Sequence, residues 1–154
     1  MSGFTIRPAR VEDLPAIAEM CHLLWPDDRA EDHARWMRPA LEGKPVGGMP
    51  DTVFVAEAEG VLIGFLEATL RSHADGCDPG HPVGYLEGWY VAPEHRRRGV
   101  GAKLVAAAEE WARAQGCSEM ASDTWIDSTG SQRAHEALGY EVVDRCVHYR
   151  KSLA

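Results

Sequence analysis

The stretch that decides the fold reads Leu86-Glu87-Gly88-Trp89-Tyr90-Val91-Ala92-Pro93-Glu94-His95-Arg96-Arg97-Arg98-Gly99-Val100-Gly101. Its first half is an apolar run, typical of a strand, that ends at a turn containing Pro93. A basic loop with glycines then leads into a segment whose apolar residues recur with the spacing of a helix face. Those residues are Val100, Leu104, Ala107, Ala108, Trp111 and Ala112. The stretch therefore predicts a strand, a basic glycine loop and a helix in direct succession.

The loop between this strand and this helix has the chemistry of a phosphate site. Gly99 and Gly101 leave room for backbone N–H groups to approach a ligand that a side chain would hold away. The donors lie at a helix N-terminus, whose partial positive charge favours phosphate groups. Arg96, Arg97 and Arg98 add positive charge beside them. The pattern predicts a pyrophosphate site; the alternative is an ordinary strand–turn–helix connection with a solvated arginine run.

The spacing of the loop separates it from two better-known phosphate motifs. The chain has neither the G-x-G-x-x-G dinucleotide fingerprint nor the G-x-x-x-x-G-K-[ST] P-loop at this place. It carries instead Arg96-Arg97-Arg98-Gly99-Val100-Gly101 after a strand that ends Trp89-Tyr90-Val91. This arrangement resembles the acetyl-coenzyme A motif of the GNAT acetyltransferase superfamily. The resemblance implies that acetyl-coenzyme A is the co-substrate and that residues 96–101 bind it.

Length and composition favour one globular domain over residues 1–154. A chain of 154 residues lies near the usual size of a domain and can bury a core of its own. No apolar stretch reaches the roughly 20 residues of a membrane span, and the N-terminus lacks the apolar region of a signal peptide. The four cysteines have no C-x-x-C spacing and indicate neither a zinc site nor a disulfide framework. We therefore expect a cytoplasmic protein with reduced thiols, no metal and no membrane partner.

The charge of the chain bears on its partners. The formal net charge is −8, although the densest basic cluster is confined to the arginine run. The rest of the surface is therefore more acidic than the total indicates. An acidic field disfavours nucleic acid and raises the local concentration of cationic ligands. The alternative is that the acidity only keeps the protein in solution.

Hydrophobic periodicity and turn residues predict alternating helices and strands along the whole chain. Expected helices cover about 11–24, 32–41, 100–115 and 128–138, and expected strands cover 4–7, 53–57, 61–71, 83–91, 119–124 and 141–149. Two early helices, a central meander and then β-α-β-α-β form an α/β (α+β) order. This is also the GNAT order. The resemblance implies a single mixed central sheet with helices on both faces and splayed strands at the coenzyme site.

In GNAT enzymes the strand before the phosphate loop parts from its neighbour. The resemblance therefore assigns the pantetheine arm to backbone groups of Trp89, Tyr90 and Val91, and the thioester carbonyl to a backbone N–H near Val91. Glu87 precedes Trp89 by two residues, so strict alternation places both side chains on one face. A carboxylate there can accept a proton from an attacking ammonium group. The alternative is a solvated glutamate on an edge strand.

A narrower resemblance rests on strings that the general fold does not demand. They are Leu24-Trp25-Pro26, Gly76-Cys77-Asp78, Leu86-Glu87-Gly88, Gly116-Cys117-Ser118-Glu119-Met120-Ala121-Ser122-Asp123-Thr124 and Val147-His148-Tyr149-Arg150-Lys151. Together they resemble bacterial aminoglycoside 6'-N-acetyltransferases. This resemblance implies acetylation of the 6'-amino group of an aminoglycoside antibiotic, by direct transfer in a ternary complex, and hence antibiotic resistance.

Aminoglycosides carry several ammonium groups, so a receptor for them needs carboxylates and an aromatic platform. The resemblance implies that the substrate contacts are Trp25, His73, Glu87, Asp123 and Asp144. Asp123 is expected chiefly to anchor the cationic sugar, with a share in deprotonation. Its alternative role is to cap a turn or the next helix, because Thr124 and a helical segment follow it.

Two positions depart from the GNAT pattern. Most GNAT enzymes place a tyrosine five residues before the aromatic residue that follows Leu-Gly at the end of the last helix, as general acid for the leaving thiolate. Counting back from Tyr140 places His135 there. A histidine can protonate the sulfur or form a hydrogen bond to it. Many GNAT enzymes also carry, seven residues earlier, an asparagine that contacts the coenzyme, and here that residue is Ser128.

Three functions compete at this point. The first is an aminoglycoside 6'-N-acetyltransferase, the second a GNAT N-acetyltransferase for another small polyamine or a protein amine, and the third a coenzyme A-binding domain without activity. The carboxyl groups of Glu87 and Asp123 beside the phosphate loop speak against the third. The apolar segment 142–150 can pair with a second copy of the chain. We therefore expect a homodimer in which residues 72–82 of one copy approach the cleft of the other.

Overall fold

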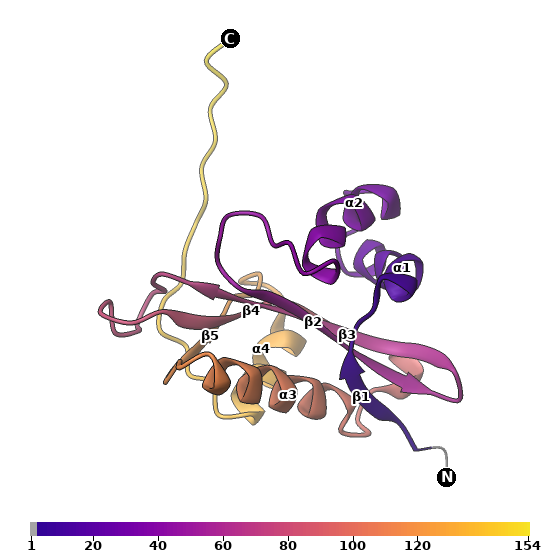
Figure 1. Ribbon diagram of the computed structural model, residues 1–154. Coiled ribbons are helices and arrows are strands. Elements are labelled where there is room, and N and C mark those ends of the chain that lie inside the picture. The colour runs from indigo at the N-terminus through magenta and orange to yellow at the C-terminus, as the bar shows by residue number, and fades with distance from the viewer. Residues whose placement is uncertain (1–2) are drawn as a thin grey trace.

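The computed structural model describes residues 3–154 and is built on one five-stranded sheet with the strand order β1-β2-β3-β4-β5 (Figure 1). The first four strands are antiparallel neighbours, and β5 runs parallel to β4. Their bounds are β1 (Thr5–Pro8), β2 (Asp51–Ala58), β3 (Val61–Arg71), β4 (Val83–Val91) and β5 (Met120–Ser122). The mixed sheet of an α/β chain is therefore confirmed.

Helices cover both faces of the sheet. The short 3-10 turn η1 (Val11–Asp13), α1 (Leu14–Leu24) and α2 (Ala30–Leu41) lie on one face, and α3 (Val100–Ala114) lies on the other after the 3-10 turn η2 (Pro93–His95) (Figure 1). The last helix, α4 (Thr129–Ala137), leads into Leu138 and Tyr140, which pack in the cluster under α3. Within residues 3–154, none of the helices has the length and apolarity that crossing a membrane requires.

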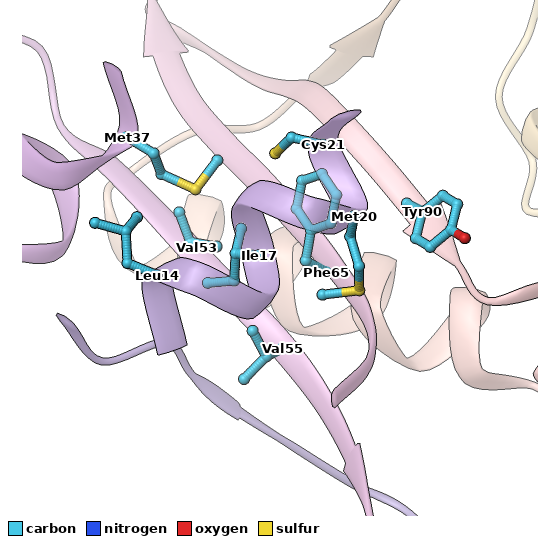
Figure 2. Packing of buried hydrophobic residues seen from close by; sticks show 9 residues of the cluster. All are labelled: Leu14, Ile17, Met20, Cys21, Met37, Val53, Val55, Phe65 and Tyr90. Carbon is cyan, nitrogen blue, oxygen red and sulfur yellow. The ribbon is translucent and has the colours of Figure 1, made fainter. Parts of the chain in front are cut away.

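The core has a layer on each side of the sheet. Figure 2 shows the layer under α1 and α2, where Ile17 of α1 meets Phe65 of β3, both fully buried. On the opposite face, Val100, Leu104 and Ala108 of α3 pack on the sheet. Each large apolar side chain buried in this way contributes about 1.5–3 kcal/mol. The two layers hold β3 and β4 firmly, and these strands carry the site described below.

The hairpin between β2 and β3 turns where the sequence predicts it. Glu59 and Gly60 both have positive φ angles, 52° and 78°. Two successive residues of this kind form the tight turn that suits the twist of paired strands. The hairpin prediction is confirmed, and β2 is longer than expected by two residues at its start and one at its end.

The strand predicted at residues 141–149 does not form within this chain. These residues are exposed, Tyr149 to 93%, and the segment runs away from the sheet toward the C-terminus (Figure 1). Near its start the segment approaches the loop between β3 and β4, since a Cβ built on Gly76 would lie 2.7 Å from Cβ of Val143. Apolar alternation specifies a strand only where a neighbouring strand supplies hydrogen-bond partners. No strand among residues 3–154 supplies them.

The expected divergence of strands is present between β4 and β5. Their pairing is limited to Gly84–Leu86 of β4 against Met120–Ser122 of β5. Beyond Leu86, β4 continues to Val91 while paired only with β3. One side of the strand at residues 87–91 is therefore open.

Candidate active site

A β-bulge in β4 determines how the side chains of the site are oriented. Glu67 of β3 pairs with Gly88, but the next residue, Ala68, pairs with Leu86. Glu87 is therefore an extra residue in β4, and the strict alternation of faces breaks at this point.

The side chains around the bulge point to opposite sides of the sheet. Leu86 and Trp89 belong to the cluster under α3. Gly88 faces α1, because a Cβ on it would lie 2.5 Å from Cη2 of Trp25. Glu87 also turns to this face, where it meets Thr69 of β3. The prediction that Glu87 and Trp89 share a face is therefore wrong, since the extra residue reverses the alternation between them.

Glu87 is held by side chains of β3 and is not a solvated edge glutamate. The Thr69 hydroxyl donates to Oε1 at 2.7 Å. Arg71 donates from Nε to Oε1 at 2.9 Å and from Nη2 to Oε2 at 2.7 Å. Such a two-pronged, charge-assisted contact is among the stronger side-chain interactions. Both carboxylate oxygens are therefore engaged within the protein.

Asp123 joins the same network through Tyr85. The Tyr85 hydroxyl donates to Oδ2 of Asp123 at 2.7 Å, and the guanidinium carbon of Arg71 lies 3.5 Å from the centroid of the Tyr85 ring. Burial, followed by the hydrogen bond to Asp123, raises the pKa of Tyr85, so its phenol remains a donor. Asp123 itself is exposed and directly follows β5. The structure thus brings the two predicted carboxylates together.

Two further carboxyl groups lie behind this network. Burial, together with the negative charges of Asp51 and Glu87, raises the pKa of Glu67 to about 8. Burial and the charge of Glu87 raise the pKa of Asp51 to about 6. Oδ1 of Asp51 is buried and has no hydrogen-bond partner among the described residues. Each negative charge in this group disfavours ionisation of its neighbours and so raises their pKa values. A cationic ligand would reduce this repulsion.

A cavity of about 350 Å³ adjoins Glu67 between the sheet and the first two helices. Trp25 forms part of its wall, 5.8 Å from His33 between ring centroids. The full lining is Cys21, Trp25, Asp28, His33, Trp36, Met37 and Glu67. The ring of Trp25, a predicted substrate contact, also covers Gly88 beside the bulge.

Two predicted substrate contacts lie outside the network. His73 is exposed just after β3, and its Nδ1 lies 3.0 Å from Oγ of Ser72. Asp144 is exposed in the terminal segment, and its Oδ1 accepts a hydrogen bond from the backbone N–H of Arg145. Within one chain the structure does not bring Asp144 to Glu87, because the strand expected to carry it there is absent.

The predicted phosphate loop, residues 96–101, has backbone conformations that are common at ligand sites. Gly99 precedes α3 with φ +79°, and a Cβ built on it would meet nothing within 4 Å. Arg97 also has a positive φ, 63°, which is uncommon for a side chain of this size. Strained backbone of this kind occurs at ligand sites, where the surrounding structure holds it in place. The open space before a 15-residue helix therefore fits a pyrophosphate group.

Other residues of the loop have structural duties. Arg96 donates from Nε to the Val91 carbonyl at 2.8 Å and so ties the loop to β4. Val100 is buried in the core, and only its backbone can face a ligand. Gly101 was expected to open space for a ligand, but a Cβ there would lie 3.0 Å from Cζ2 of Trp89. Gly101 makes room for that indole. Arg98 is exposed beside the loop.

His135 lies on the α3 side of β4, beside Trp89. Its ring is perpendicular to the Trp89 ring, with centroids 5.2 Å apart. Nδ1 lies 2.7 Å from the Ser131 carbonyl, which can only accept, so Nδ1 carries a proton. Nε2 lies 2.8 Å from Oγ of Ser122, whose hydroxyl also lies 3.4 Å from the Leu86 carbonyl. Both ring nitrogens are thus engaged within the protein.

Two further predicted coenzyme contacts have polar groups that the protein leaves unpaired. Nε1 of Trp89 is a buried donor without a hydrogen-bond partner among residues 3–154, and it faces Gly101 of α3. Ser128 is the N-cap of α4, and its side chain makes no capping hydrogen bond. Among the described residues, no group of three or more His, Cys, Asp or Glu side chains is arranged to hold a metal ion.

Sequence reasoning missed several members of this site. They are Asp51, Glu67, Thr69, Arg71, Tyr85 and Ser122. A usable signal exists for Thr69 and Arg71, because they alternate in β3 with Glu67 and so share its face. Their pairing with Glu87 depends on the bulge, which no local pattern reveals.

Comparison with known proteins agrees with this geometry. The model of the Acetyltransferase (GNAT) family matches residues 17–140. Aminoglycoside N(6')-acetyltransferase type 1 of Klebsiella aerogenes is 41% identical over 149 residues, which cover 96% of each chain. The protein of the same name from Serratia marcescens is 42% identical over 144 residues, with 92% of this chain and 94% of that one covered.

Solved structures show the same relationship. The aminoglycoside N-acetyltransferase AAC(6')-Iy in complex with CoA has a TM-score of 0.87 and 38% identity, over 98% of this chain and 96% of that one. AAC(6')-Iy in complex with the bisubstrate analogue CoA-S-monomethyl-acetylneamine has a TM-score of 0.86 and 38% identity, over 98% and 99%. With this fold, phosphate loop and degree of similarity, the chain belongs to the acetyltransferase (GNAT) family, among the relatives of aminoglycoside N(6')-acetyltransferases.

Proposed function

We propose that this protein transfers the acetyl group of acetyl-coenzyme A to the 6'-amino group of aminoglycoside antibiotics. The observation that carries the proposal is the grouping of Glu87 and Asp123, beside the point where β4 and β5 diverge, with the partly buried carboxyl groups of Asp51 in β2 and Glu67 in β3. A polyammonium ligand offers several charge-assisted hydrogen bonds to such a group. The names of the relatives supply the substrate class.

The residues present fit the coenzyme. The open cradle at Gly99 and the N-terminus of α3 suit its pyrophosphate, and the unpaired side of β4 suits its amide-bearing arm. When bound, acetyl-coenzyme A supplies an activated acyl group as a thioester. A backbone N–H near Val91 would polarise the thioester carbonyl, and Trp89, Tyr90 and Ser128 would contact the coenzyme along the strand and at the start of α4.

The proposed mechanism has two proton transfers to or from the protein, one on each side of β4. On the face of α1 and α2, Glu87 accepts a proton from the substrate ammonium, while Asp123 anchors the sugar. The free amine then forms a C–N bond to the acetyl carbon as the C–S bond breaks, and the new cationic nitrogen releases its second proton to water. On the α3 side, an imidazolium form of His135 would donate from Nε2 to Ser122, whose hydroxyl proton passes to the departing sulfur. The products are an acetamide and the coenzyme thiol.

Release of coenzyme thiol tests this function directly. Purified protein would be mixed with acetyl-coenzyme A and a panel of kanamycin, tobramycin, spermidine and a lysine peptide. We expect turnover with the aminoglycosides and, by NMR, an acetyl group on the 6'-nitrogen. Thiol release with spermidine or the peptide alone would assign another amine to the enzyme. Direct transfer predicts intersecting initial-rate lines, whereas parallel lines would indicate a covalent intermediate.

The biological role has its own test. We propose that the enzyme is cytoplasmic, because all four cysteines are free and thiols stay reduced in the cytoplasm. We also propose that its activity confers resistance to aminoglycosides. Expression in a susceptible bacterium should raise the inhibitory concentration of kanamycin, whereas the Glu87→Gln variant at equal abundance should not. An unchanged inhibitory concentration with active enzyme would contradict the resistance role.

We further propose that the protein is a homodimer. β5 is the outer strand of the sheet, and Val142, Val147 and Tyr149 are exposed in an extended segment without a partner. A second copy can supply the missing neighbour by strand addition. Asp144 and residues 72–82 of one copy can then reach the cleft of the other. Light scattering at micromolar concentration should show a dimer, and a monomeric mass would contradict it.

A further inference from the structure

We infer that Arg71 is an internal competitor for the substrate ammonium and that it makes the site select amines of high positive charge. The inference rests on the proposed function, because it takes Glu87 as the group that receives the amine. It starts from an observation about the resting site: a cation of the protein already occupies the carboxylate.

The contacts of Arg71 are those expected of a bound cationic ligand. Its guanidinium contacts both oxygens of Glu87, at 2.9 and 2.7 Å, and its central carbon lies 3.5 Å from the centroid of the Tyr85 ring. Tyr85 is in turn fixed by Asp123. A carboxylate on one side and an aromatic face on the other also suit a substrate ammonium group. An approaching amine therefore meets an occupied receptor.

Arg71 can leave this place without disturbing the fold. It is the last residue of β3, and residues 72–82 form the connection that follows. Its side chain is 43% exposed, compared with 24% for that of Glu87. Rotation of the side chain alone can therefore turn the guanidinium into solvent. Glu87 keeps the hydrogen bond from Thr69 when Arg71 departs.

Displacement of Arg71 makes charge the criterion of selection. A monoamine exchanges one cation at Glu87 for another and gains little. A polyamine makes the same exchange and also places ammonium groups near Asp123 and near Asp51, whose buried Oδ1 has no hydrogen-bond partner among the described residues. Only the second kind of ligand gains enough from the cleft to displace the guanidinium. A residue that merely held Glu87 in position would instead affect all amines alike.

The test compares two amines of different charge and the same reacting group. Kanamycin is the polyamine, and methyl 6-amino-6-deoxyglucopyranoside is the monoamine. Arg71→Met keeps the alkyl stem and removes every donor, whereas Arg71→Lys keeps the charge without the two-pronged contact. Arg113→Gln is the matched control, since it removes an exposed cation of α3 that pairs only with Glu110.

We expect Arg71→Met to raise kcat/KM for the monoamine about tenfold, which is the order of one hydrogen bond to a charged group. The value for kanamycin should change far less, so the preference for the polyamine falls. Arg71→Lys should lie between wild type and Arg71→Met, and Arg113→Gln should keep the wild-type preference. If Arg71→Met proves unfolded by thermal melting, the Lys variant alone decides, because any lowered preference supports the inference.

Two other results would overturn the inference. An equal fall in kcat for both amines at unchanged KM would make Arg71 a positioning residue for Glu87. An unchanged preference in both variants would remove its role in selection while leaving the proposed function intact. If the wild-type enzyme acetylates neither amine but retains acetyl-coenzyme A binding, the proposed function itself fails and the inference falls with it.

Discussion

The carboxylate of Glu87 and the indole of Trp89 lie on opposite faces of β4, although only Gly88 separates them in the chain. Glu87 lies on the face of the sheet that α1 and α2 cover, where Thr69 contacts it, and Trp89 packs between Gly101 of α3 and His135 of α4. In the proposed mechanism the bulge therefore assigns proton acceptance from the amine and protonation of the thiolate to different sides of one strand.

Glu87→Gln should lower kcat by about 10²–10⁴-fold, the usual effect of removing a general base. The isosteric amide can keep the hydrogen bond from Thr69, so the loss reports proton acceptance more than position. Steady-state kinetics with kanamycin would measure it. A near-wild-type kcat would mean that water or Asp123, and not Glu87, accepts the proton of the substrate ammonium group.

Asp123→Asn should act mainly on substrate affinity. An anchor that grips the ground state and the transition state equally raises KM when it is removed, with a smaller change in kcat. We expect an increase in KM of about tenfold for kanamycin, equivalent to one charge-assisted hydrogen bond. Calorimetric titration of the variant would show whether affinity falls in parallel. A fall in kcat with unchanged affinity would make Asp123 the base.

Gly88→Ala should displace Trp25, because the new methyl group would lie 2.5 Å from Cη2 of that ring. Overpacking of this kind typically destabilises by about 1–3 kcal/mol. We expect a lower melting temperature and a higher KM for aminoglycosides. Gly130→Ala is the matched control, since its Cβ in α4 would meet nothing within 4 Å. Equal melting temperatures for the two variants would show that the ring yields freely.

Gly99→Val should weaken coenzyme affinity far more than aminoglycoside affinity. The side chain would fill the cradle, and φ +79° is unfavourable for a β-branched residue. Gly116→Val separates the two effects, because Gly116 follows α3 with φ +91° and equal open space but lies at the other end of the helix. Calorimetry should show normal coenzyme binding by the Gly116 variant. Equal losses in both variants would indicate general destabilisation and leave the cradle unsupported.

The buried carboxyl of Glu67 should make stability fall as pH rises. Its pKa of about 8 in the folded protein exceeds the ordinary value of 4.5, so the folded state binds more protons between these values. The free energy of unfolding therefore declines across this window and stays low above pH 8. Glu67→Gln, which remains neutral, should exceed wild type in stability at pH 8.5 by a few kcal/mol and match it near pH 4.

Urea unfolding at the two pH values measures this difference. Glu136→Gln, a change at an exposed glutamate of α4, is the control and should follow wild type at both pH values. If Glu67→Gln and wild type showed the same dependence on pH, the Glu67 carboxyl would have to be ionised in the folded protein.

Most of the fold could be predicted because its helices, turns and central strands depend on residues that are close together in the sequence. The turn at Glu59-Gly60, the apolar face of α3 and the glycine loop all follow from neighbouring residues. The prediction of a terminal strand at residues 141–149 was wrong because a strand needs a neighbouring strand, and sequence alternation does not show whether the chain itself supplies one. Because this strand is absent, Asp144 does not come close to Glu87 within one chain.

The candidate site was predictable to a lesser extent. Glu87 and Asp123 were found through resemblance, and the structure places both in one network. The prediction that Glu87 and Trp89 share a face was wrong because one extra residue in β4 breaks the alternation between them. Arg71 escaped notice because its importance lies in a contact across strands, 16 residues away in the chain.

The bulge at Glu87 also has an evolutionary consequence. In the proposed mechanism the two faces of β4 around the bulge serve different ligands, so selection for a new amine can alter the α1–α2 face without changing how the thioester is held. By contrast, insertion or deletion of one residue in β4 outside the bulge would shift the alternation and turn the side chains on one side of the change to the opposite face. Point substitutions in this strand should therefore change the range of amines that the enzyme accepts, whereas changes of strand length outside the bulge should be removed by selection.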